Sequence, residues 1–249
     1  MKKFASFFAV FLFITLFAVA SEAGDRNIPV EVAQLTDSLK KQFAPDRRVA
    51  LLDVDYSFSD KNVMLRGVTT SAEAKNALLK ELARKGYAVM DCLELLPDVK
   101  GLEGKTCGII NVSVANMRVA PDFSSEMMTQ SLMGMPVRVL QRDGWVRIQT
   151  PDNYIAWVHR VGVHPVTEEE MAAWNKAEKI VVTAHYGFVY SEPNQTSQTV
   201  SDVVAGNRLK WEGSKGAFYK VTYPDGRRGY ISKSIAMPEK KWRSGLQQD

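Results

Sequence analysis

The sequence predicts an α+β protein, in which a small α/β domain is followed by two small β-barrels that a short helix joins. Apolar residues recur at helical spacing before Pro97 and again in one short segment near Trp174, whereas short alternating strands fill the rest. A hairpin pattern at residues 144–158 also returns at residues 217–231. Such a return at a fixed offset is typical of a duplicated domain.

The N-terminus has the features of an export signal. Lys2 and Lys3 precede a largely apolar run from Phe4 to Val19 without a charged residue, and small residues suited to cleavage follow up to Ala23. The run is shorter than the roughly 20 apolar residues of a membrane span. We therefore expect residues 1–23 to be a signal peptide, with no membrane span after processing. The mature protein is expected to be exported to the periplasm or the cell envelope.

Residues 25–104 are expected to form the small α/β domain. Helical spacing of apolar residues predicts a helix over Val30–Phe43, and Ser71 can cap a second helix over Ala72–Lys85. Alternating apolar residues predict three strands, at Arg48–Tyr56, Val63–Gly67 and Tyr87–Leu96. The element order is then helix, strand, strand, helix, strand.

In this N-terminal segment, Val63–Val68 is followed by the Ser-capped helix and a strand. In this pattern the segment resembles the exported domain family called BON. The resemblance implies a BON-like α/β domain. The alternative is a packing domain of the same size without a site, because an apolar strand followed by a capped helix occurs in many folds.

Two repeats fill the rest of the chain. A shift of 73 positions superposes Trp145 on Phe218 without a gap, and upstream of the hairpin a shift of 72 superposes Gly134 on Gly206. One residue is therefore inserted before the second hairpin. Each repeat has about sixty residues, and strands this short must close or pack on neighbours to bury a core. The two repeats and the helix between them are expected at residues 107–166, 178–238 and 167–177.

The linker helix has a strong start signal. Thr167 and Glu170 form a capping box, and Val166 can pack onto Met171 as a hydrophobic staple. Trp174 gives the helix an apolar anchor. We therefore expect this helix to hold the two repeats in a fixed orientation.

The residue inventory argues against an enzyme. The 3 His residues lack zinc-ligand spacing, and there is no Gly-rich phosphate loop or Ser nucleophile elbow. Neither Cys92 nor Cys107 lies in a strand-to-helix turn that would lower its pKa. We expect no catalytic residue, no metal site and no cofactor in this chain. The two cysteines either form a disulfide in an oxidising compartment or remain separate, and sequence leaves both possibilities open.

The charge pattern points away from nucleic acid as a partner. The formal charge of +4 falls to +3 once Lys2, Lys3 and Glu22 are removed, and no dense basic cluster remains. Aromatic side chains favour a binding surface instead, because aromatics with polar tips are enriched where polymers or peptides dock. Of these, Trp145 and Trp157 are expected in the core.

Five motifs carry a second resemblance. They are Asn111–Arg118, Glu126–Gly134 and the hairpin from Gly144 in the first repeat, and Val200–Gly206 and Tyr223–Arg227 in the second. They resemble the first and the second bacterial SH3-like domain, respectively, of NlpC/P60-type cell-wall cysteine peptidases. Members of that family cleave murein peptides between γ-D-glutamate and a diamino acid. The resemblance implies that both predicted barrels are SH3-like.

The resemblance also implies a function for the region. In the family a catalytic domain with a Cys in an Asp-Cys-Ser-Gly-type motif and a His base follows the SH3-like domains. Residues 239–249 would form the linker toward that domain, so these 249 residues are expected not to hydrolyse murein. Our first hypothesis is the targeting and substrate-selecting module of such a peptidase, with a catalytic domain possible in cis. The alternative is a stand-alone periplasmic adaptor whose SH3-like surfaces bind a protein or glycan partner.

Two candidate site residues follow from the same resemblance. In the family, an acidic residue and a tyrosine of the first SH3-like domain hold the free amino terminus of the murein peptide. Glu126 corresponds to the acid and Tyr154 to the tyrosine, and both could accept hydrogen bonds from an ammonium group. Asn153 and Ala156 stand where the family's Gly-Tyr-x-Gly-Trp pattern has glycines, a departure that affects how Tyr154 is held.

Overall fold

The computed structural model describes residues 29–245, and the signal peptide expected at residues 1–23 lies outside them. The chain divides into two compact units. The first unit contains the described residues up to Pro45 together with Ala50–Leu95, and the second contains Asp46–Val49 and the chain from Leu96 onward.

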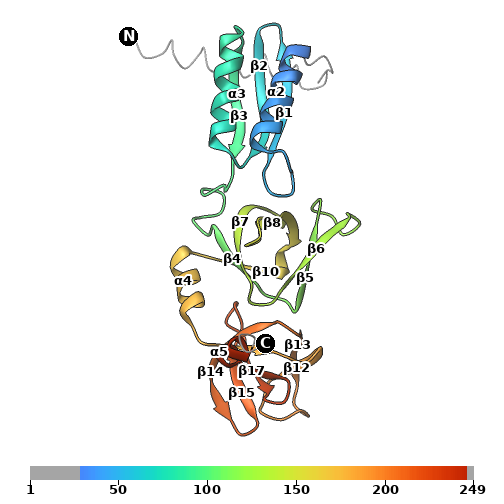
Figure 1. Cartoon of the computed structure of the whole chain (residues 1–249), viewed down its shortest axis with the longest axis vertical. Coiled ribbons are helices and arrows are strands. Elements are labelled where there is room, and N and C mark those ends of the chain that lie inside the picture. Colours follow the sequence, from blue (N-terminus) through green and yellow to red (C-terminus); the bar gives the residue numbers. More distant parts are fainter. Residues whose placement is uncertain (1–28, 246–249) are drawn as a thin grey trace, which may run out of the picture. The chain divides into compact units, whose positions relative to one another are not determined.

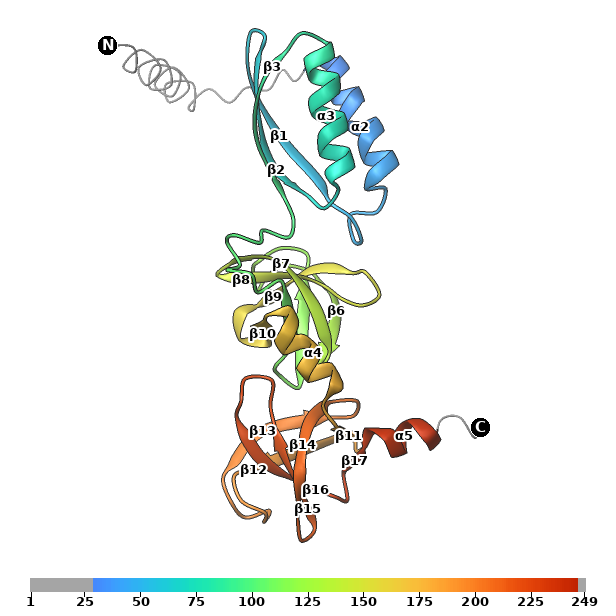
Figure 2. The same cartoon turned by 90° about the vertical axis from the view of Figure 1, so that its left-hand side faces the viewer.

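The first unit is a three-stranded sheet with two helices. In the strand order β1-β2-β3, β1 (Leu52–Ser59) is antiparallel to β2 (Asn62–Thr69), and β3 (Ala88–Leu95) is parallel to β2. The helices α2 (Val30–Phe43) and α3 (Ala72–Arg84) lie on the same face of this sheet (Figure 2). The predicted order of these five elements is confirmed.

The sequence explains how α3 forms and which side it buries. The Ser71 hydroxyl accepts a hydrogen bond from the backbone N–H of Ala74 at 3.0 Å, which satisfies a free donor of the first turn. Ala74, Leu78 and Leu82 follow at helical spacing and are buried against the sheet, which contributes Leu65 to the same core.

The second unit contains two antiparallel sheets of seven strands each (Figure 1). The first repeat has β4 (Cys107–Ile110), β5 (Val114–Arg118), β6 (Met127–Leu132), β7 (Pro136–Asp143), β8 (Trp145–Gln149), β9 (Ile155–His159) and β10 (Val163–Val166), with the short helix η2 (Arg160–Gly162) before β10. The second repeat has β11 (Lys179–Val182), β12 (Tyr186–Tyr190), β13 (Thr199–Val204), β14 (Arg208–Lys215), β15 (Phe218–Thr222), β16 (Arg228–Ser232) and β17 (Ala236–Pro238), and α5 (Glu239–Gly245) follows.

The two sheets have the same topology. The order β10-β4-β7-β8-β9-β5-β6 corresponds strand for strand to β17-β11-β14-β15-β16-β12-β13. A register irregularity between Val139 and Gln141 in β7 recurs between Trp211 and Gly213 in β14, and both pairs of positions differ by 72. β-bulges are retained at equivalent positions in related domains. The duplication inferred from the sequence is therefore confirmed in the strand order and in the bulge.

The linker helix α4 (Glu168–Lys176) starts as predicted. The Glu170 N–H donates to Thr167 Oγ1 at 3.2 Å, and the Thr167 N–H donates to Glu170 Oε2 at 2.8 Å, which completes the capping box. The apolar side of the helix packs on the first repeat, in a cluster of Met171, Trp174, Ile109 and Val166.

A turn of the first repeat is buried in the second repeat. Met133, which lies between β6 and β7, is only 1% exposed and belongs to the core of the second repeat. Its carbonyl accepts from the Arg208 N–H at 2.9 Å. The next residue, Gly134, accepts from Trp174 Nε1 at 3.3 Å, so the same turn also contacts α4.

Polar contacts extend this junction. Ser113 Oγ donates to Asp202 Oδ2 at 2.6 Å, and the Ser113 carbonyl accepts from Asn207 Nδ2 at 2.8 Å. Asn111 Nδ2 donates to Asp225 Oδ2 at 2.9 Å. Together with Met133, these bonds join the two repeats through both apolar and polar side chains.

The predicted α+β class is wrong. Strands take 44% and helices 21% of the described residues, and two seven-stranded antiparallel sheets dominate, so the protein is mostly β. The first unit, with three strands and two helices, does not change this class, and no separate domain of the BON type is evident. The prediction gave too much weight to two helical segments. It also counted Leu102 with the N-terminal domain, although this side chain is buried in the core of the first repeat.

Three further features bear on the sequence-based expectations. Cys92 and Cys107 are both free, so of the two alternatives the structure has separate thiols.

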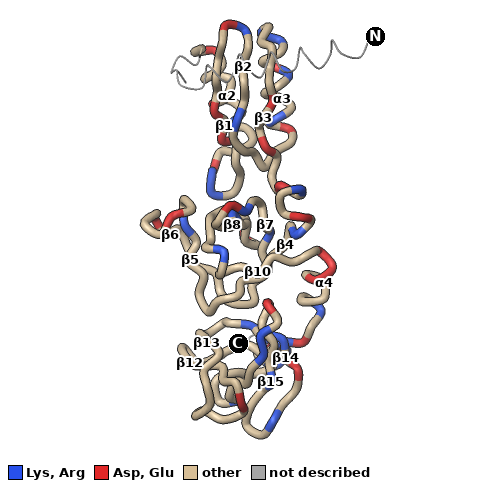
Figure 3. The backbone as a smooth tube through the Cα atoms, turned by 180° about the vertical axis from the view of Figure 1, so that it is seen from behind, with Lys and Arg blue, Asp and Glu red and all other residues tan. Residues whose placement is uncertain are grey.

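Between residues 29 and 245, no helix combines the length and the apolar character needed to cross a bilayer. Lys and Arg are interspersed with Asp and Glu along both units (Figure 3).

Candidate functional site

Glu126 lies immediately before β6 and is exposed. Its carbonyl accepts from the Val119 N–H at 3.0 Å, which fixes the backbone beside the end of β5. The neighbouring Ser125 carbonyl accepts from Arg118 Nη1 at 2.5 Å. The Glu126 backbone is therefore held in place, while its carboxylate is open to solvent.

Tyr154 lies at the tip of the β8–β9 hairpin and is half-buried. The tip is closed by the Thr150 side chain, whose Oγ1 accepts from the Tyr154 N–H at 3.1 Å, and by the Thr150 N–H, which donates to the Tyr154 carbonyl at 3.0 Å. Asn153 has a φ of 71°, in the left-handed region that asparagine tolerates better than most residues. The asparagine that replaces a family glycine therefore still permits this turn.

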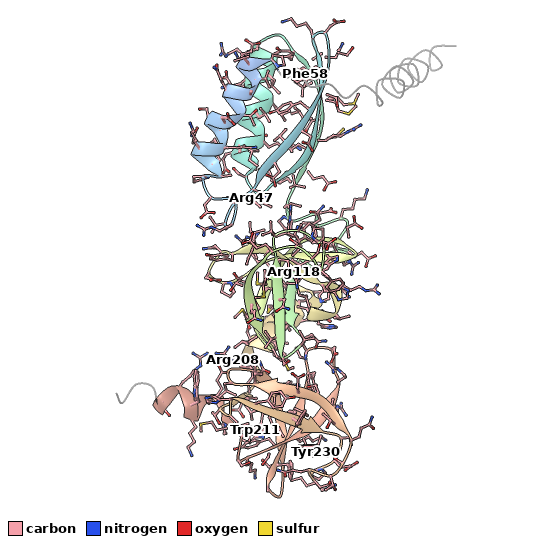
Figure 4. The ribbon with its side chains drawn as sticks, turned by 90° about the vertical axis from the view of Figure 1, so that its right-hand side faces the viewer. Arg47, Phe58, Arg118, Arg208, Trp211 and Tyr230 are labelled. Carbon is pink, nitrogen blue, oxygen red and sulfur yellow. The ribbon has the colours of Figure 1, made fainter. Side chains whose placement is uncertain are left out.

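The two candidate residues flank one strand. The sheet order β9-β5-β6 places β5 between the strand that follows Tyr154 and the strand that follows Glu126. No hydrogen bond joins Glu126 to Tyr154 in the part of the chain that the structure describes. Arg118, labelled in Figure 4, lies on the intervening β5 opposite Trp157. Sequence reasoning did not assign this arginine to the site.

The short segment Asp46–Val49 also reaches the hairpin tip. The Arg48 carbonyl accepts from the Ile155 N–H at 2.6 Å, and the Arg48 guanidinium carbon lies 5.9 Å from the centre of the Tyr154 ring. This distance is at the outer limit of a cation–π contact. Arg48 was expected in a strand, but β1 begins only at Leu52. The cause is tertiary, since the backbone of Arg48 bonds to Ile155 of β9 and this segment belongs to the second unit.

Asp46 orients this arginine. Arg48 Nε donates to Asp46 Oδ1 at 2.9 Å and Arg48 Nη2 to Asp46 Oδ2 at 2.7 Å. These side-chain hydrogen bonds lower the pKa of Asp46 to about 2. The guanidinium beside Tyr154 is therefore held by a carboxylate of its own segment.

An aromatic cluster lies elsewhere on the first repeat. The ring centres of Phe123 and Trp145 are 4.8 Å apart, and His159 lies 5.0 Å from Phe123 and 5.3 Å from Trp145. Phe123 is 67% exposed. The core position expected for Trp157 is confirmed at 8% exposure, whereas Trp145 is only half-buried. Sequence reasoning missed Phe123, whose signal was a large apolar residue in a polar loop.

Among residues 29–245, no group of three or more His, Cys, Asp or Glu side chains is placed to hold a metal ion.

Family models identify the two repeats. The model described as "Bacterial dipeptidyl-peptidase Sh3 domain" matches residues 117–161, and the model described as "Bacterial SH3 domain" matches residues 185–235. The first matched range includes Glu126 and Tyr154. A search of curated proteins finds no match.

Solved structures give more distant similarities. An NlpC/P60 family protein from Bacillus cereus is 20% identical, with a TM-score of 0.44, over 53% of this chain and 55% of that protein. An NlpC/P60 endopeptidase from Photobacterium damselae subsp. piscicida is 15% identical, with a TM-score of 0.42, over 57% of this chain and 35% of that protein. The chain thus spans about half the length of the first protein and about a third of the second. On the family models, this chain contains two bacterial SH3 domains, one in each repeat.

Proposed function

We propose that this chain is the cell-wall-targeting and substrate-selecting region of an NlpC/P60-type murein peptidase. The first SH3 domain recognises the free N-terminal amine of a murein peptide, and hydrolysis falls to a catalytic domain in cis. The observation that carries this proposal is the match of residues 117–161 to a dipeptidyl-peptidase SH3 domain, because that range contains both Glu126 and Tyr154.

The chemistry of the two residues supports an amine ligand. The exposed carboxylate of Glu126 can accept charge-assisted hydrogen bonds from an ammonium group, and the phenolic oxygen of Tyr154 is a second, neutral acceptor. Arg118 on the intervening strand would repel a ligand that carried only positive charge. It suits a short peptide with an ammonium group at one end and carboxylates along its length.

Export is part of the same proposal. It rests on the charged start, the apolar run and the small residues of the first 23 positions, since the assembled murein layer lies outside the cytoplasmic membrane.

Calorimetry with a murein tripeptide that has a free N-terminus tests the amine clamp. We expect weak binding, which falls about tenfold or more in Glu126→Ala, because a charge-assisted hydrogen bond is lost. N-acetylation of the peptide should have a similar effect. Gln198→Ala is the matched control, because Gln198 occupies the position of Glu126 in the second repeat. Tight binding that Glu126→Ala leaves unchanged would rule out the clamp.

Aromatic side chains of the second repeat favour an alternative function for the chain. In this alternative, the chain is a stand-alone exported adaptor that binds a protein or glycan partner. Tyr186, Phe188 and Tyr190 alternate along β12 and therefore share one face, with ring centres 5.1 Å and 6.4 Å apart. Tyr230, labelled in Figure 4, lies opposite Tyr190 on β16. Tyr186 is 58% exposed. Retention on murein sacculi that Tyr186→Ala abolishes and Glu126→Ala does not would favour this adaptor.

A further inference from the structure

A cavity of about 300 Å³ lies on the first repeat, between the tip of the β8–β9 hairpin and the linker helix α4. This volume is at the lower end of the range for small-ligand sites. The wall is apolar where Met171 and Val137 line it. Its polar side chains are those of Arg138 of β7, Gln149 of β8, Thr150 and Asn153 of the hairpin tip and Asn175 of α4.

Arg138 is the only arginine or lysine that lines this cavity, and it is held in place by a buried partner. Gln149 is 9% exposed, and its Oε1 accepts from Arg138 Nη1 at 2.9 Å. The amide of Gln149 is itself fixed, because Nε2 donates to the carbonyls of Asn153 and Val49, each at 3.3 Å. A guanidinium has five N–H donors, and this arrangement engages one of them.

The second repeat shows what the first repeat lacks. Lys210 on β14 occupies the position of Arg138, and its Nζ pairs with Glu212 Oε1 at 2.9 Å. The position of Glu212 is taken in the first repeat by Leu140, which is buried at 1% exposure. Within residues 29–245, no carboxylate forms an ion pair with Arg138. Both repeats thus have a cationic side chain at this position, but only the second repeat supplies a carboxylate, Glu212, that pairs with it.

A nearby acid does not fill this role. Glu168 of α4 acts on the Cys107 thiol, whose pKa is raised first by burial and then by that carboxylate, while Arg138 opposes the shift. Glu168 forms no ion pair with Arg138 in the described part of the chain. The guanidinium therefore faces the cavity with charge and hydrogen-bond donors to offer.

We propose that this cavity binds the carboxylate group of a small ligand or of a peptide end, with Arg138 as its charged contact. A guanidinium matches a carboxylate in a two-point, planar contact, which an ammonium group cannot make. The side-chain amides of Asn153 and Asn175 can bond to the polar part of the ligand, and Met171 and Val137 suit an aliphatic part. This site is separate from Glu126 and does not depend on the amine clamp.

Calorimetry and amide chemical shifts of the full chain test the proposal with three probes. N-acetyl-alanyl-alanine offers a peptide carboxylate, its C-terminal amide removes the charge, and N-acetylmuramic acid offers a sugar carboxylate. All three lack a free amine, so Glu126 is not engaged. We expect one of the two carboxylates to bind and to change the amide chemical shifts of residues around Arg138. The affinity for the amide should be lower by about tenfold or more. Whichever carboxylate binds identifies the source of the ligand.

Variants distinguish binding in this cavity from a general effect of positive charge. Arg138→Gln should lower the affinity about tenfold or more, and Arg138→Lys should restore only part of it, because the planar fork is lost. Lys210→Gln removes the same charge in the second repeat and should leave binding unchanged. Arg138 is exposed, and thermal melts of each variant check that the fold persists. If neither carboxylate binds, or if Arg138→Gln binds as the natural sequence does, the proposal is overturned.

Discussion

The two SH3 repeats have the same strand order and the same bulge, yet their β-turns have different surroundings. The turn between β6 and β7 in the first repeat inserts Met133 into the second repeat. The equivalent residue of the second repeat, Ala205, is exposed. One turn therefore acts as an interface and its copy remains a surface turn. Duplication preserved the fold, while divergence changed what each turn contacts.

The hairpin tips differ in the same way. In the first repeat, the tip at Tyr154 contacts the segment that contains Arg48. In the second repeat, Arg227 stands at that position, lies 4.5 Å from the centre of the Tyr223 ring and donates to Asp225 at 2.7 Å. Burial raises the pKa of Tyr223 to about 12, although Ser201 shares a hydrogen bond with its hydroxyl. The second hairpin tip is therefore held by packing and hydrogen bonds at the interface between the two repeats.

The largest expected effect tests the buried turn. Met133→Ala should destabilise the chain by about 2 to 5 kcal/mol, because it leaves a cavity in the core of the second repeat. Ala205→Ser, at the equivalent exposed turn, should change stability by less than about 0.5 kcal/mol. Urea denaturation of both variants measures the difference. Equal effects would mean that the two turns are not used differently.

A smaller difference is expected between two glycines of these turns. Gly134 and Gly206 have φ angles of 84° and 87°, so alanine at either position costs about 1 to 2 kcal/mol. A Cβ on Gly134 would also lie 2.4 Å from the backbone oxygen of Arg208, whereas a Cβ on Gly206 would lie 2.9 Å from Leu132 Cδ1, a side-chain tip.

Because backbone yields less readily than a side-chain tip, Gly134→Ala should cost about 1 to 3 kcal/mol more than Gly206→Ala. Urea denaturation midpoints of the two variants, analysed with the same dependence of unfolding free energy on urea concentration, give this comparison of stability. A greater loss in Gly206→Ala would contradict the contact that sets the first turn apart.

The smallest effect concerns pH. Burial alone would raise the pKa of Asp225, but hydrogen bonds from Asn111 and Arg227 outweigh it, and the pKa is lowered. A carboxyl with a lowered folded-state pKa stabilises the protein above its unfolded value of about 4. This contribution is lost as the pH falls through the folded value.

Asp225→Asn should therefore destabilise the chain by less than about 1 kcal/mol at pH 7, since the group is partly exposed. The variant should also lose less stability than the natural chain as the pH falls from about 5 to 3. Asp152→Asn, at the equivalent position of the first tip, is the control for changes at neutral pH. Thermal unfolding across this pH range gives the result, and an unchanged pH profile in Asp225→Asn would refute the role of this carboxylate.

Much of the local structure could be predicted from the residues. The strand alternation on both sides of Pro151 indicated the β8–β9 hairpin, and the offset to Pro224 indicated its copy. The pair Thr167 and Glu170 indicated the start of α4. These signals are reliable because the groups that bond lie within a few positions of one another. The class was predicted wrongly, because the helices and strands were recognised but their shares were misjudged: strands take 44% and helices 21% of the described residues.

Sequence by itself determined the elements, the duplication and the one-residue offset between the repeats, since each depends on backbone hydrogen bonds and on side-chain period. Only the tertiary structure decided that Met133 is buried in the neighbouring repeat and that Arg48 lies beside Tyr154. It also decided that Arg138 lines a cavity and that, among residues 29–245, no carboxylate pairs with it. The physical reason is the same in each case. Burial and charge pairing depend on groups that are distant along the chain, and local periodicity carries no information about which distant groups meet.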